Sequence, residues 1–154
     1  MAGLEDLYRE IILDHYKSPR LQGELDPPAG RAVGYNPLCG DEVVVTVAVQ
    51  NGAIADIRTT GQGCSISKSS ASMMAQAVKG KTLVEVGTLT RAFKEQLSIR
   101  DEDAEEHDYS NVKLGELEAL RGVMKFPSRI KCATLAWNTL AQAVQDAAPA
   151  AEPS

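Results

Sequence analysis

The chain has 154 residues, of which 44% are hydrophobic and 24% are charged, and this balance is typical of one globular domain. With 16 Lys and Arg residues against 21 Asp and Glu, the net charge is −5. No basic block is present, so we do not expect a nucleic acid partner. No apolar run reaches about 18 residues and no signal-like segment opens the sequence, so we expect a cytoplasmic protein without a membrane span.

The N-terminal part of the chain predicts one helix followed by a long loop. Apolar residues recur at helical spacing from Leu4 to Tyr16. Pro19 disfavours helical backbone at the residue before it and therefore ends this helix. The stretch 21–36 is rich in glycine and proline and is typical of a loop, with a short strand over Arg31–Val33.

A hairpin and a second helix follow this loop. The segment Val43–Val49 is rich in β-branched residues, and Asn51-Gly52 is the signal of a tight antiparallel hairpin that leads into Ala53–Thr60. The apolar period then changes to that of a helix over residues 66–78. Gly80 stands where a glycine commonly ends a helix.

The second half of the chain begins with a further helix and an acidic connection. Thr82 and Glu85 have the spacing of a helix-capping box, which predicts a helix that continues towards Leu97. Residues 101–108 concentrate acidic side chains. We interpret them as a solvated loop, with an acidic recognition site as the alternative.

The remaining elements complete a prediction of the fold class. A short helix is predicted over Leu114–Met124 and a longer one over Arg129–Gln145. Because the strands are grouped instead of alternating with helices, we expect an α+β fold in which several helices pack on a small antiparallel sheet of about three strands. We expect one domain over residues 1–146 and a disordered tail over 147–154.

The three cysteines all lie at predicted boundaries between elements, where a scaffold presents reactive groups. Cys39 comes just before the valine-rich strand, Cys64 lies between the hairpin and the next helix, and Cys132 lies in the first turn of the last helix. A bend at Gly40 would let Cys39 and Asp41 share one metal ion. Three thiolates and one carboxylate would then supply the four ligands of a tetrahedral zinc site.

Spacing alone leaves other interpretations open. Free cysteines are often buried as small hydrophobic residues, and the separations here match no short zinc-finger pattern. A cysteine nucleophile would need a histidine base, for which the chain offers His15 on a helix face and His107 in the acidic segment. A phosphate-binding loop around Gly61–Gly63 would lack the Gly-Lys-Ser/Thr ending of such loops.

Five motifs in order, together with the N-terminal segment Leu7–Arg9, extend this interpretation. They are Asp14–Arg20, Asn36–Asp41, Gly61–Ser67, Ser70–Met74 and Arg129–Trp137. Together these segments resemble the SufU branch of the IscU-like iron–sulfur cluster assembly proteins, and the resemblance runs from about Leu4 to Leu140.

Two details favour the SufU branch over IscU, and a missing segment bears on chaperone binding. Lys131 stands where IscU proteins typically have a histidine. The acidic stretch around 100–115 lengthens the separation between the second and third cysteines. The Leu-Pro-Pro-Val-Lys segment by which IscU proteins engage a chaperone is absent, with residues 126–131 in its place. The resemblance therefore does not imply a chaperone-driven release of clusters.

The resemblance implies a zinc site formed by Cys39, Asp41, Cys64 and Cys132. It also implies that Cys39 accepts persulfide sulfur from a SufS-type pyridoxal-phosphate cysteine desulfurase, which makes the chain a sulfurtransferase that acts with this partner. The sulfur would pass on to a downstream Suf scaffold or to thiol acceptors. Zinc binding and attack on sulfur compete for one lone pair, so we hypothesise that the docked partner supplies a replacement ligand and frees Cys39.

The same ligands also fit an alternative function. Soft thiolates suit both zinc and iron–sulfur clusters, so the chain could instead be a scaffold that assembles a [2Fe–2S] cluster and passes it on. In either case the ligands carry excess negative charge that nearby donors should offset. Arg129 is the candidate catalytic residue for this task, since a guanidinium orients a thiolate or carboxylate with paired donors. Lys131 also flanks Cys132, but an ordinary cation in solvent is at least as good an interpretation of it. His15 is expected to pack under the first helix.

Overall fold

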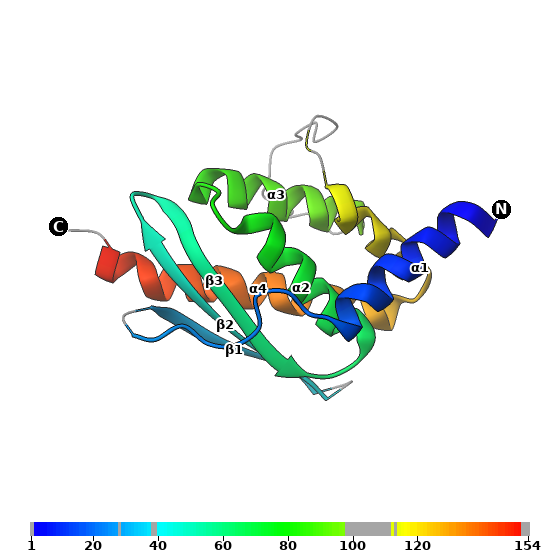
Figure 1. Cartoon of the computed structure of the whole chain (residues 1–154), viewed down its shortest axis with the longest axis horizontal. Helices are drawn as coiled ribbons and strands as arrows, with labels where there is room; N and C mark the ends of the chain where they lie inside the picture. The colour runs from blue at the N-terminus through cyan, green and yellow to red at the C-terminus, as the bar shows by residue number, and fades with distance from the viewer. Residues whose placement is uncertain (1, 28, 38–39, 98–111, 113, 152–154) are drawn as a thin grey trace.

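The computed structural model describes residues 2–27, 29–37, 40–97, 112 and 114–151. Three strands form one antiparallel sheet in the order β1-β2-β3, and helices pack against it (Figure 1). The elements in chain order are α1 (Ala2–Lys17), β1 (Gly30–Asn36), β2 (Asp41–Gln50), β3 (Ala53–Gln62), α2 (Ser65–Val78), α3 (Leu83–Gln96), the 3-10 helix η1 (Gly115–Lys125) and α4 (Pro127–Ala151). The predicted α+β fold is confirmed.

The hairpin between β2 and β3 forms where the sequence predicts it. Asn51 and Gly52 both have positive φ, at 54° and 74°. A type I′ turn requires positive φ at both central residues, which explains the Asn-Gly pair. On the other side of β2, β1 pairs in a register that ends with Asn36 opposite Asp41. This end of the ladder places Asn36 beside Asp41, one of the predicted metal ligands.

The core lies between the sheet and the helices, and α2, α3, η1 and α4 all contribute buried side chains to it. Helix α4 packs on β1 and β2, while α2 packs on α4 and β3 (Figure 1). The inward residues Val43, Val45 and Val47 of β2 are at most 3% exposed. Each buried side chain of this size contributes roughly 1.5–3 kcal/mol of transfer free energy. The valine-rich strand therefore anchors α4 to the sheet.

A capping box and an aromatic pair fix helix α3. The Thr82 side chain accepts the N–H of Glu85 at 3.1 Å, and the Glu85 carboxylate accepts the N–H of Thr82 at 3.0 Å. This reciprocal pair is the predicted capping box of α3. Further along α3, the Phe93 ring stacks on Trp137 of α4, with ring centroids 4.6 Å apart. Among the described residues, no helix is both long and apolar enough to cross a membrane.

Several boundaries differ from the prediction. Strand β1 covers seven residues instead of the three over 31–33. The segment predicted as a short helix over 114–124 adopts 3-10 geometry. Helix α4 continues to Ala151, so residues 147–151, predicted to belong to a disordered tail, are helical. The acidic segment 101–108 lies outside the described residues.

Candidate metal centre

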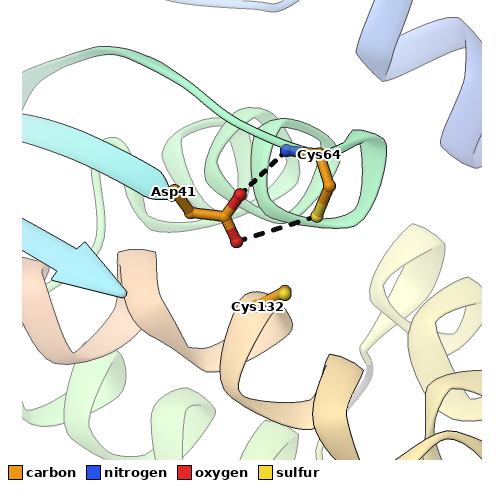
Figure 2. A group of neighbouring side chains, drawn as sticks. All are labelled: Asp41, Cys64 and Cys132. Atoms are coloured by element: carbon orange, nitrogen blue, oxygen red, sulfur yellow. Dashed lines mark hydrogen bonds between the residues drawn. The ribbon is translucent and has the colours of Figure 1, made fainter. Parts of the chain in front are cut away.

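Three of the four predicted ligands converge at one end of the sheet. Asp41 begins β2, Cys64 precedes α2, and Cys132 lies in the second turn of α4. One ligand atom from each residue lies within 4.8 Å of the other two. Figure 2 shows the carboxylate of Asp41 facing Cys64 on one side, with the sulfur of Cys132 directed towards it from α4.

Asp41 is fully buried and is held by the backbone of Cys64. Its Oδ1 accepts the backbone N–H of Cys64 at 2.8 Å, and its Oδ2 lies 3.7 Å from the Cys64 sulfur. Gly63 has a φ of +151°, and a Cβ atom there would lie 2.3 Å from Oδ1 of Asp41. Only glycine therefore lets the chain pass this close to the carboxylate.

Cys64 is the N-cap residue of α2. Its backbone is extended, with φ −73° and ψ 167°, and its sulfur accepts the N–H of Ser67 at 3.5 Å. A serine or aspartate oxygen usually makes this bond at the start of a helix. The capping geometry therefore fixes the side chain of Cys64 at the helix end, facing Asp41.

Cys132 completes the group from the opposite side and is fully buried. Its sulfur accepts a hydrogen bond from Nδ2 of Asn36 at 3.9 Å and donates to the carbonyl oxygen of Ser128 at 3.9 Å. At the next residue of α4, the carbonyl of Ala133 accepts the hydroxyl of Ser70 of α2. These contacts hold the sulfur-bearing turn of α4 against both β1 and α2.

The donor set fits a thiophilic divalent metal ion. Two sulfurs and one carboxylate oxygen are ligand types that tetrahedral zinc accepts, and neighbouring ligands in such a site lie about 3.5 Å apart. The separation of 3.7 Å between the Asp41 oxygen and the Cys64 sulfur is close to this value. A fourth donor would complete a tetrahedral site.

The predicted fourth ligand, Cys39, lies outside the described residues. The next residue, Gly40, has a φ of +69°, which supports the predicted bend, and its N–H donates to the carbonyl of Asn36 at 2.8 Å. Arg129 is exposed in the first turn of α4, and its backbone N–H donates a hydrogen bond to the carbonyl of Phe126. A role for the Arg129 guanidinium stays a prediction.

The other predicted residues near the site have different environments. Lys131 is exposed on α4. His15 is fully buried, with Nδ1 2.7 Å from Oγ of Ser72 and Nε2 3.2 Å from Oε1 of Glu116. It therefore connects α1 to α2 and η1, in keeping with the expected packing role.

Sequence reasoning missed one residue of this site, Asn36. Its side chain is buried against Cys132 although the residue lies at the end of a glycine-containing strand. The available signal was its place at the start of the segment Asn36–Asp41. A polar residue followed by proline is typical of a turn, and that interpretation gave no reason to expect a sulfur contact.

The fold and the gathered side chains define a class of small α+β proteins with a metal-binding group at one end of the sheet. The chain belongs to the family of the NifU-like N terminal domain, whose model matches residues 7–133. The resemblance to IscU-like proteins that the sequence motifs indicated is thereby confirmed.

Known relatives cover nearly the whole chain. The zinc-dependent sulfurtransferase SufU of Bacillus subtilis is 41% identical over 143 residues, which span 93% of this chain and 92% of the relative. The iron–sulfur cluster assembly scaffold protein IscU of Streptococcus pyogenes serotype M1 is 41% identical over 97% of this chain and 90% of its own length. Among solved structures, SufU of Fervidobacterium islandicum AW-1 superposes with a TM-score of 0.76 at 28% identity, covering 90% of this chain and 97% of that one.

Proposed function

We propose that this chain binds one zinc ion through Cys39, Asp41, Cys64 and Cys132. The observation that carries the proposal is the convergence of Asp41, Cys64 and Cys132 from three separate elements. Cys39 is two residues from Asp41 along the chain, so a short bend at Gly40 suffices to bring a third thiol to the group. Bound zinc would keep the ligating thiols deprotonated and tie the three elements together.

We further propose that the protein accepts sulfur for iron–sulfur cluster assembly, with Cys39 as the acceptor. The thiolate of Cys39 attacks the outer sulfur of a cysteine persulfide on a SufS-type pyridoxal-phosphate desulfurase. A new S–S bond forms on Cys39, the S–S bond of the donor breaks, and the donor cysteine leaves as a thiolate. The similarity to the zinc-dependent sulfurtransferase SufU supports this function.

The proposed role for Arg129 follows from its position. It is exposed in the first turn of the helix that carries Cys132, and we propose that it helps to offset the negative charge of the metal ligands, since a guanidinium orients a thiolate or carboxylate with paired donors. After transfer, the sulfur would pass to a downstream Suf scaffold or to thiol acceptors. We place these reactions in the cytoplasm, where thiols stay reduced.

The alternative function is that of a scaffold that assembles and transfers a [2Fe–2S] cluster on the same ligands. The similarity to the IscU scaffold of Streptococcus pyogenes favours it. Thiolates bind both zinc and iron–sulfur clusters, so the ligand set does not separate the two functions.

Metal analysis of the purified protein, combined with desulfurase assays, separates the functions. Sulfur acceptance predicts a colourless protein with about one zinc per chain that accelerates cysteine turnover by the desulfurase. A scaffold predicts visible cluster absorbance that can be transferred to an apo-acceptor. A protein that loses its fold on chelation, yet leaves the desulfurase rate unchanged, would be a structural zinc module and would overturn the proposal.

The variant Cys39→Ser tests the acceptor itself. Mass spectrometry after alkylation should detect a persulfide on residue 39 in the native protein and none in the variant. Sulfur acceptance by the variant at the native rate would overturn the role of Cys39.

A further inference from the structure

Each of the three gathered ligand candidates receives an N–H donor from the protein. Asp41 receives the backbone N–H of Cys64 at 2.8 Å, and the sulfur of Cys64 receives the backbone N–H of Ser67 at 3.5 Å. The sulfur of Cys132 receives its bond from the side chain of Asn36. Any residue type except proline could supply the first two donors, which are backbone N–H groups, whereas the third depends on the identity of residue 36.

Asn36 is fixed in place by its position in the sheet. It is the last residue of β1, lies opposite Asp41 in the register and is only 6% exposed. Its backbone carbonyl accepts the N–H of Gly40 at 2.8 Å, which closes the connection between β1 and β2. Asn36 therefore makes two contacts, through its side chain with Cys132 of α4 and through its backbone with Gly40, the neighbour of Asp41.

The hydrogen-bond roles at Cys132 are complementary. The sulfur donates its hydrogen to the carbonyl of Ser128, so its lone pairs are left to accept the amide of Asn36. A metal-bound thiolate has no hydrogen to donate and carries more charge, so an N–H donor to it forms a charge-assisted bond. A donor of this kind withdraws electron density from the sulfur and offsets the negative charge of several thiolates and a carboxylate on one ion.

We infer that Asn36 is a positioning residue of the metal centre, which orients the sulfur of Cys132 and tunes its electron density through an N–H···S bond. This inference rests on the proposed metal-binding function. Partners of metal ligands typically change metal affinity about 10–100-fold when they are removed. A contact that served only to fill space would leave the electronic properties of the bound metal unchanged.

The test uses Asn36→Leu, which keeps the branched shape of the side chain and removes its donor. Asn138→Leu is the matched control, because Asn138 is exposed on α4, the helix that carries Cys132, and accepts a bond from Lys94. Cobalt(II) is added to each metal-free full-length protein, and the sulfur-to-cobalt charge-transfer absorbance is recorded. Zinc affinity is then measured by competition with a chelator. Circular dichroism reports whether each variant is folded.

Loss of the N–H donor raises the energy of the sulfur lone pair. We therefore expect Asn36→Leu to shift the charge-transfer band to longer wavelength and to bind zinc about 10–100-fold more weakly, with Asn138→Leu unchanged. If leucine prevents folding, Asn36→Ala gives the same readouts. An unshifted band with native zinc affinity in the folded variant would overturn the inference and leave the metal site standing. Failure of the native protein to bind either metal would overturn the proposed function itself, and this inference with it.

Discussion

Replacing Gly63 with alanine tests how closely the chain packs against Asp41. A Cβ atom at residue 63 would lie 2.3 Å from Oδ1 of Asp41 and 3.0 Å from its Cα, and the backbone has a φ of +151°. The Cα belongs to a strand that is paired on both sides and cannot move away easily. The carboxylate must therefore swing aside, which breaks its bond to the N–H of Cys64.

The expected loss of stability has two parts. A backbone conformation at this φ costs a residue with a side chain of the order of 1–3 kcal/mol. Loss of a hydrogen bond to a charged group costs about 1.5–3 kcal/mol. We expect Gly63→Ala to lower the free energy of unfolding by about 3–6 kcal/mol in total, which is a large share of the 5–15 kcal/mol typical of a domain.

Urea unfolding in the presence of a chelator measures this loss without a contribution from metal. Two other glycines separate the causes. Gly80 also has positive φ, at +85°, but a Cβ there meets nothing within 4 Å, so Gly80→Ala reports the backbone cost alone. Gly87 lies inside α3 with open space around it, and Gly87→Ala should stabilise the protein by roughly 0.5–1 kcal/mol. If Gly63→Ala costs no more than Gly80→Ala, the close packing of Asp41 against residue 63 is refuted.

Three further predictions follow from the same structure. Cys64→Ser and Cys132→Ser should each reduce bound zinc below about one equivalent per chain, and metal analysis that finds native zinc in both would contradict the site. Trp137→Ala should cost about 3–5 kcal/mol in urea unfolding because the ring is fully buried against Phe93, whereas Asn138→Ala on the exposed face should stay within about 0.5 kcal/mol. Hydrogen bonds from the backbone and side chain of Thr82 hold the pKa of Glu85 below its ordinary value of 4.5. The capping contribution is therefore fully present above that ordinary value and is lost as pH falls through the lower folded-state pKa. The stability difference between the native protein and Glu85→Gln should shrink over this acidic range, and a difference independent of pH would contradict the cap.

Local signals in the sequence were sufficient for most of the fold. The Asn51-Gly52 turn and the capping box at Thr82 each depend on a few neighbouring residues, and both form as predicted. Gly80, predicted to end α2, has a φ of +85° and follows the C-cap residue of that helix. Interactions within a few residues therefore determine these boundaries.

Strand β1 shows why other boundaries could not be predicted. Its glycines suggested a loop, yet they are required by the helix packed on the strand. A Cβ at Gly30 would lie 2.1 Å from the carbonyl oxygen of Ala143, and one at Gly34 would lie 2.0 Å from the side chain of Thr139. Both partners lie on α4, more than a hundred residues away in the sequence. No local pattern contains this information.

The same limit applies to the candidate site. The resemblance to a family identified Asp41, Cys64 and Cys132 together, whereas spacing alone left buried, unrelated cysteines as an open alternative. Asn36 could not be found in this way, because its importance depends on the register that places it beside α4. A hydrogen bond from Asn36 to a sulfur that is 96 positions away in the sequence can be recognised only when strand pairing and helix packing are both known.

The origin of the three gathered side chains has a consequence for how the fold opens. They come from a strand, a helix start and the early part of α4, with Asp41 and Cys64 already 23 positions apart in the sequence. An ion held by them is a cross-link that closes long loops and so reduces the conformational entropy of the unfolded chain. Further along α4, Trp137 is held by stacking on Phe93, a contact that involves none of the metal ligands. Chelation should therefore loosen the Cys132 end of α4 first, and amide hydrogen exchange would show a gradient of protection along this single helix.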